Sequence, residues 1–155
     1  MFRSLCKKQR RNGEKMIDNN CAYCVEGDLV AKFGIKICEL PTSKVYLFKE
    51  QSHPGRCIVA HKKHVGDMNE LTAQERAAYF EDVAKVARAI MTAFNPDKVN
   101  YGAYGDTGHH LHFHLCPKYE GKEEWGGTFL MNTGNLVDER ACQEVAKKII
   151  ENYEA

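Results

Sequence analysis

The stretch that most constrains this chain runs from residue 109 to 117, where the sequence reads His-His-Leu-His-Phe-His-Leu-Cys-Pro. From His110 onward, histidine alternates strictly with Leu or Phe, so an imidazole falls on every second residue. A period of two is typical of a β-strand with one polar and one buried face. We therefore predict a strand that presents its histidines on one face. Pro117, which has no N–H for the ladder, is expected to end it.

A row of imidazoles on a rigid strand suits two kinds of chemistry. Imidazole titrates near neutral pH, so it can act as a nucleophile, a general acid or a general base. Neutral imidazole is also the commonest protein ligand for zinc. The alternative is a surface strand whose polar positions happen to be histidine, but histidine gains nothing there over Thr or Lys in strand propensity.

Composition bounds the class of protein. A chain of 155 residues with 43% hydrophobic and 28% charged residues suits one soluble globular domain. A net charge of +1 predicts neither a nucleic-acid nor a membrane partner, and no run approaches the ~18 apolar residues of a membrane span. Seven cysteines without a secretory leader favour reduced thiols and a cytoplasmic location.

The charge is unevenly distributed along the chain. Residues 1–19 contain six basic and two acidic side chains and no hydrophobic periodicity. We interpret this stretch as a flexible basic tail, with a mitochondrial presequence as the weaker alternative. Residues 20–155 are then expected to form a single domain.

Cys21 and Cys24 form a C-x-x-C pair at the start of that domain. Two thiols at this spacing can share one metal ion or form a redox pair. The redox alternative requires a βαβ context, which the flanking sequence does not provide. Spare histidines elsewhere in the chain favour the metal, since they could complete a tetrahedral set of ligands.

The remaining sequence predicts an α+β fold. Residues 35–48 suggest an antiparallel hairpin, and residues 56–60 and 99–104 suggest two further strands before the histidine-rich one. A long helix is expected over residues 71–94, and a second amphipathic helix over residues 137–153. Because the strands come as hairpins and the helices come late, the sheet of about five strands should be antiparallel.

The long helix carries its own signals. Thr72 and Glu75 match a capping box at its start, and Asn95-Pro96 stops it. Apolar residues recur along it at spacings of three and four, and form one stripe: Phe80, Val83, Ala87, Ile90 and Phe94.

The run from His110 to Cys116 resembles the His-φ-His-φ-His-φ-φ signature of the histidine triad (HIT) superfamily of nucleotide hydrolases and transferases. The resemblance covers roughly residues 20–131 and is strongest to bacterial-type members that carry a C-x-x-C pair. A Pro-Gly turn, an apolar strand and His64 match a second family segment. Arg56 and His61 depart from it, standing where the family usually has His and Pro.

This resemblance implies an enzyme that transfers a nucleotidyl group to water. The substrate would be a dinucleoside polyphosphate or a nucleoside phosphoramidate, attacked at its α-phosphate. His112 would be the nucleophile and would become covalently nucleotidylated. His114 would contact a phosphoryl or bridging oxygen and help to protonate the leaving group.

The resemblance leaves two roles open for His110. It would orient His112 or contact phosphate, as in metal-free members, or it would bind zinc, as in members with a C-x-x-C pair. In the second case one structural zinc per chain would be held by Cys21, Cys24, His64 and His110.

The family also implies residues that bind the purine nucleotide or dinucleotide, here Asn100, Gly105, Thr107 and Trp125. Arg56, which departs from the family pattern, could instead pair with a phosphate, as the geometry of its guanidinium allows. Its members place the active site near a two-fold interface, so a homodimer is expected, with the long helix in contact and Trp125 reaching across. The alternative to an enzyme is a non-catalytic nucleotide-binding protein or a zinc-stabilised regulatory module.

Overall fold

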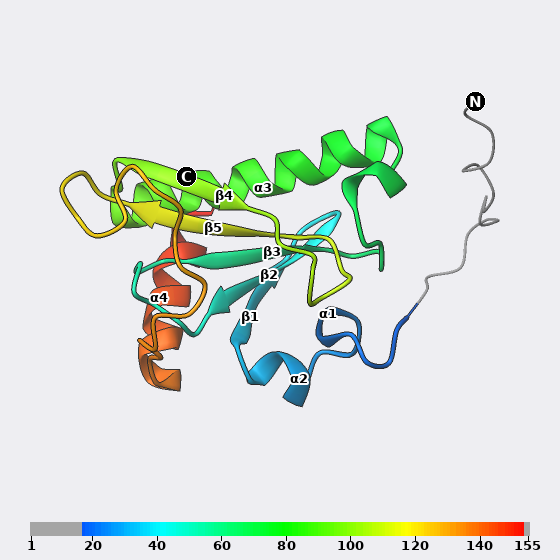
Figure 1. Cartoon of the computed structure of the whole chain (residues 1–155), viewed down its shortest axis with the longest axis horizontal. Coiled ribbons are helices and arrows are strands. Elements are labelled where there is room, and N and C mark those ends of the chain that lie inside the picture. Colours follow the sequence, from blue (N-terminus) through cyan, green and yellow to red (C-terminus); the bar gives the residue numbers. More distant parts are fainter. Residues whose placement is uncertain (1–16, 154–155) are drawn as a thin grey trace, which may run out of the picture.

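A computed structural model describes residues 17–153 of the chain; most of the expected basic tail, residues 1–16, lies outside this range. The fold is α+β, as predicted, and is built on one five-stranded antiparallel sheet of order β1-β2-β3-β5-β4 (Figure 1). The strands are β1 (Gly34–Glu39), β2 (Ser43–Phe48), β3 (Cys57–His61), β4 (Lys98–Gly102) and β5 (His112–Lys118).

The histidine-rich strand β5 lies inside the sheet, between β3 and β4. The prediction that Pro117 ends this strand is wrong, because Pro117 pairs with Val99 of β4 and the strand continues to Lys118. Its pairing with β3 stops at Leu115, so the missing N–H of Pro117 removes no bond on that side. The strand also begins two residues later than predicted, and His110 precedes it.

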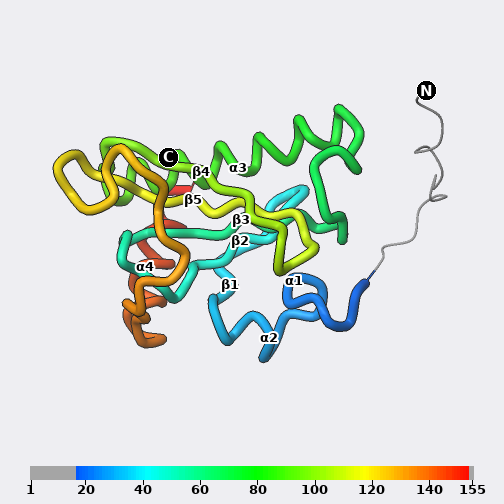
Figure 2. Tube along the Cα trace, in the orientation of Figure 1, coloured from blue at the N-terminus to red at the C-terminus, as the bar shows by residue number. Residues whose placement is uncertain are grey.

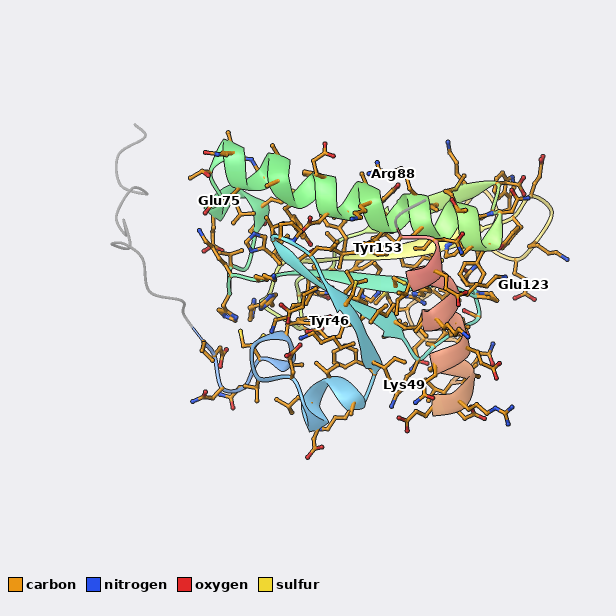
Figure 3. All side chains as sticks on the ribbon, turned by 180° about the vertical axis from the view of Figure 1, so that it is seen from behind. Tyr46, Lys49, Glu75, Arg88, Glu123 and Tyr153 are labelled. Carbon is orange, nitrogen blue, oxygen red and sulfur yellow. The ribbon has the colours of Figure 1, made fainter. Side chains whose placement is uncertain are left out.

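Two helices cover one face of the sheet: α3 (Ala73–Phe94) and α4 (Glu139–Glu151). The capping box of α3 is confirmed, since the Thr72 hydroxyl accepts from the Glu75 backbone N–H and the Glu75 carboxylate accepts from Thr72. Figure 3 shows this face, with Tyr153 just beyond α4 and beside α3; the Lys85 ammonium lies 5.0 Å from its ring centroid. Among the described residues, neither helix is both long and apolar enough to traverse a lipid bilayer.

The opposite face is covered by much shorter elements. Two single-turn helices, α1 (Ala22–Val25) and α2 (Asp28–Ala31), lie below the sheet in Figure 2 and were not predicted from the sequence. The loop between β4 and β5 descends toward α1 in the same view. A 3₁₀ turn, η1 (Met68–Glu70), precedes α3.

Candidate active site and metal centre

The three alternating histidines lie on the face that carries α1 and α2, as the period of two predicts. His110, His112 and His114 are 2%, 8% and 3% exposed. Their neighbours Leu111, Phe113 and Leu115 belong to the hydrophobic core beneath α3 and α4. Each imidazole therefore sits on a backbone that is fixed from the other side.

The hydrogen bond that His112 makes fixes which ring nitrogen carries its proton. Its Nδ1 lies 2.7 Å from the backbone carbonyl of His110. Because a carbonyl only accepts, Nδ1 must donate, and Nε2 keeps a free lone pair in the neutral ring. Burial lowers the pKa of His112, which favours this neutral form. The arrangement is that of a nitrogen nucleophile.

His114 is the most strongly perturbed imidazole of the three. Burial, with further contributions from His112 and Arg56, lowers the pKa of His114 to about 3. Its Nδ1 is buried and has no hydrogen-bond partner among the described residues. A buried nitrogen without a partner costs free energy unless a ligand satisfies it, so this atom is a candidate contact for a bound group.

Four potential metal ligands meet beside the triad. The ligand atoms of Cys21, Cys24, His64 and His110 all lie within 4.8 Å of one another. The Nδ1 atom of His110 is 3.3 Å from the Cys21 sulfur and 3.3 Å from Nδ1 of His64. The Cys24 sulfur lies 3.2 Å from His64 Nδ1 and 3.7 Å from His110 Nδ1.

These separations fit a tetrahedral zinc ion. With Zn–S near 2.3 Å and Zn–N near 2.0–2.1 Å, a regular tetrahedron places ligand atoms roughly 3.3–3.8 Å apart. Nε2 of His110 lies 2.6 Å from the His61 carbonyl, so it donates there and leaves the Nδ1 lone pair facing the sulfurs. Such an outer partner is typical of metal-binding histidines. The four separations given above and the tautomer of His110 are therefore compatible with a zinc site.

A pocket of about 450 Å³ opens in front of the triad and beside the four ligands. Aromatic and apolar side chains line it together with the three histidines: Tyr23, Phe33, Phe48, Ile58, Tyr104 and Met131. The Tyr23 ring lies 5.2 Å from the His110 ring and 5.1 Å from the His112 ring, centroid to centroid. Tyr23 stands between the two cysteines of the C-x-x-C pair, so the four-residue cluster and the pocket share one wall.

Comparison with known proteins decides the family. The family model of the HIT domain matches residues 34–121, more than half of the chain. The chain belongs to the HIT family. The histidine triad comprises His110, which precedes β5, and His112 and His114 on β5; the four-residue cluster lies at the N-terminal end of this strand.

Relatives and solved structures agree with this assignment. Protein hit of Bacillus subtilis is 28% identical over 117 residues, which cover 71% of this chain and 79% of that protein. A histidine triad protein of Sinorhizobium meliloti is 25% identical, with a TM-score of 0.72 over 81% of this chain and 94% of its own. A zinc-bound histidine triad family protein of Mycobacterium smegmatis is 18% identical, with a TM-score of 0.62 over 85% and 94%.

Two of the residues predicted to bind substrate in this HIT domain lie close to the triad. Thr107 lines the main pocket. Gly105 lines an adjoining cavity of about 110 Å³, together with His110 and His112. The loop that carries Gly105 and Thr107 therefore lies beside His112.

The other three predicted residues do not line that pocket in the described part of the chain. Asn100 faces a separate cavity between β4 and Phe129. Trp125 is 43% exposed and lies in a turn after β5. Arg56 is fully buried, and its guanidinium pairs with Glu50 at 2.9 Å.

Sequence reasoning missed most of the pocket wall. Tyr23 had a usable signal, because any residue inside a metal-binding C-x-x-C must lie close to the metal. Phe48 ends a strand that was predicted, but the face on which its side chain lies depends on the register with β1 and β3. Met131 comes from a segment without regular structure, and no local pattern places it at the triad.

Proposed function

We propose that this chain is a nucleotide hydrolase or transferase that acts at an α-phosphate and forms a covalent nucleotidyl intermediate on His112. The observation that carries the proposal is the bond from His112 Nδ1 to the His110 carbonyl, because it leaves Nε2 free at a pocket. Membership of the HIT family supports the reaction class. A dinucleoside polyphosphate and a nucleoside phosphoramidate are the proposed substrates.

The first step makes a P–N bond and breaks the bond to the leaving group. Nε2 of His112 donates its lone pair to the α-phosphorus, and the leaving group departs with the electron pair of its own bond. A bound phosphate would raise the pKa of His114 above the value of about 3 that burial imposes. His114 can then carry the proton that the leaving group takes.

Water reverses this chemistry in the second step. Its oxygen bonds to phosphorus while the P–N bond breaks and returns the electron pair to Nε2. The proton that the water loses passes to His114, which restores the starting state. Backbone N–H groups around Gly105 and Thr107 are suited to balance charge on the non-bridging oxygens.

The nucleoside is expected to occupy the aromatic part of the pocket. Tyr23, Phe33 and Phe48 offer ring faces and edges of the kind on which a purine base packs. An aromatic wall of this kind accepts either purine.

Zinc is proposed as a structural ion held by Cys21, Cys24, His64 and His110. With four protein ligands it would have no open position for substrate, and would supply only a fixed link between the N-terminal segment and the triad. A zinc-bound protein of the same fold supports this assignment. All six cysteines in residues 17–153 are free thiols, which fits a reducing compartment such as the cytoplasm.

A homodimer completes the proposal. β4 is an edge strand of the sheet, and Tyr101 on it is 53% exposed. Phe80 and Met91 on α3 are also unusually exposed for large apolar side chains. A two-fold contact between copies would bury such residues, and would bring Trp125 within reach of the partner's pocket. Light scattering should therefore give about twice the chain mass of 17.6 kDa.

The reaction class is tested by incubating purified protein with adenosine phosphoramidate and with a diadenosine polyphosphate. Release of AMP at a rate proportional to protein concentration supports the enzyme. Binding of AMP without turnover of either compound would favour the non-catalytic nucleotide-binding protein. Absence of both binding and turnover would favour the zinc-stabilised regulatory module.

A further inference from the structure

A buried ion pair lies directly behind the wall of the pocket. Arg56, at the start of β3, and Glu50, after β2, are 0% and 1% exposed, and their charged atoms are 2.9 Å apart. Neither side chain lines the pocket among the described residues. The pair is therefore separated from any substrate by other side chains.

The pair connects two segments that are distant in the sequence. Glu50 accepts from the Thr133 hydroxyl as well as from Ser52 and Arg56. Arg56 donates through Nη1 to the Leu130 carbonyl at 2.9 Å. Backbone bonds continue the same contact between residues 49–51 and residues 135–137. The ion pair is thus the side-chain anchor of the segment that follows β5.

The same guanidinium supports two residues that do line the pocket. Nη2 of Arg56 lies 3.1 Å from the sulfur of Met131. Its carbon Cζ lies 4.7 Å from the ring centroid of Phe48 and 4.9 Å from that of Phe129, so the planar group is held between two rings. Phe48 in turn meets the His114 ring edge-on, with centroids 5.3 Å apart.

Stability alone is a weak explanation for such a pair. Removing two charges from water costs several kcal/mol per ion, and apolar residues of similar volume often serve at least as well. Nε of Arg56 has no hydrogen-bond partner among the described residues, which adds to that cost. Unlike an apolar side chain, an arginine forms directional hydrogen bonds. Those of Arg56 to Glu50, Leu130 and Met131 fix the positions of all three residues.

We propose that Arg56 and Glu50 are positioning residues for the nucleotide pocket, which they shape by holding Met131 and Phe48 in its wall. The inference rests on the proposed nucleotide site and concerns how that site is shaped. It assigns Arg56 a role from behind the wall, in place of direct contact with a phosphate. His112 itself does not depend on the pair for its orientation, because its ring is held by the His110 carbonyl.

The test is a set of variants titrated with AMP by calorimetry and assayed for turnover. Arg56→Met and Glu50→Gln should each weaken AMP binding roughly tenfold, and should raise KM by a similar factor with kcat reduced less than about threefold. Because the two residues act as a unit, the double variant should be little worse than either single one. Arg140→Met and Glu144→Gln, which remove an exposed ion pair of α4, serve as matched controls and should change nothing.

Direct phosphate contact predicts a different pattern. In that case Arg56→Met would weaken binding, while Glu50→Gln would release the guanidinium and leave binding unchanged or tighter. A purely structural pair would lower the melting temperature without changing the affinity or KM of the folded protein. Either result overturns the proposal.

Met131→Ala keeps the test decisive if Arg56→Met does not fold. It leaves the ion pair in place and removes the side chain that the pair holds, so AMP binding should again weaken about tenfold. Unchanged binding in Met131→Ala would count against the inference alone. Failure of the wild-type protein to bind AMP would overturn this inference together with the proposed function.

Discussion

The two faces of the sheet are built by different means although they share the same strands. The face beneath α3 and α4 is packed mainly with aliphatic and aromatic side chains, with buried Asp82, Ser43 and His61 as polar exceptions. The opposite face buries histidine, arginine, glutamate and tyrosine, most of them with specific partners. Strand β5 contributes to both, with Phe113 on one face and His112 on the other.

The difference teaches where stability and chemistry reside in this fold. Apolar packing tolerates changes of detail because it depends on area and volume. The chemistry of the histidine face depends on specific contacts between atoms. Examples are His112 Nδ1 with the His110 carbonyl and His110 Nδ1 with the Cys21 sulfur. Substitutions on the helix face should therefore change the free energy of unfolding, and substitutions on the histidine face should change rate, affinity or metal content.

The largest effect is expected from His112→Ala. Loss of a covalent nucleophile should reduce turnover by about a thousandfold or more, while AMP binding and the melting temperature change little. Steady-state kinetics with thermal unfolding on the same sample measures both. A variant that keeps more than about a tenth of the wild-type rate would contradict the assignment of His112.

Although the proposed zinc site lies on the histidine face, we expect it to contribute to the free energy of unfolding as well. Cys24→Ser should lose the metal and about 4 kcal/mol or more of unfolding free energy, because metal binding to the folded state stabilises it. Acidification should release zinc as well, since the thiolates must stay deprotonated to bind. The protein that remains folded should keep most of its rate.

Elemental analysis of protein purified without chelator is the measurement for zinc. We expect one ion per chain in the wild type and in Cys38→Ser, a control that removes a thiol outside the cluster. Far less than one zinc per wild-type chain would return His110 to an orienting or phosphate-binding role.

On the helix face, Ile90→Ala should act on stability alone. Ile90 is fully buried in the core, so truncation should cost about 3 kcal/mol, while kcat per folded molecule stays within about twofold. Urea unfolding and kinetics at a temperature where the variant remains folded test this pair of expectations. A large fall in kcat without loss of stability would contradict the assignment of stability to the helix face and chemistry to the histidine face.

The smallest effect is expected at the start of α3. Hydrogen bonds from Lys63 and Thr72 lower the pKa of Glu75 from 4.5 to about 2. A carboxyl group with a lowered pKa in the folded state stabilises the protein above about pH 4.5, and this contribution is lost as the pH falls toward 2. Glu75→Gln should cost about 0.5 kcal/mol at pH 7, because the group is near the surface, and the difference from wild type should shrink below pH 4.5. A difference that stays constant between pH 7 and pH 3 would contradict this.

The sequence predicted what depends on periodicity and on short-range chemistry. The alternation in residues 110–115 placed the triad on one face, and Thr72 with Glu75 located the start of α3. The family resemblance predicted Cys21, Cys24, His64 and His110 as one set of metal ligands, and these four side chains do meet.

What the sequence could not predict depends on contacts between distant segments. Phe80 was placed on the apolar stripe of α3, yet its side chain is 44% exposed. Tyr79 and Val83 are buried against the sheet instead, and packing alone decides which residues of the helix face the sheet. The burial of Arg56 required a partner at Glu50 and a covering segment that begins 73 residues later, at Phe129. Neither of these contacts produces a periodic pattern in the sequence.

The central claim, that His112 forms a covalent bond to the nucleotide, is tested most directly by mass spectrometry of the intact protein. Wild-type protein mixed with adenosine phosphoramidate and quenched in base within one turnover should carry one added adenylyl group, and peptide mapping should place it on His112. The adduct should be base-stable and acid-labile, as a phosphorus–nitrogen bond to imidazole is. It should be absent from His112→Ala. Full turnover with no adduct at any quench time, or an adduct on another residue, would contradict the account.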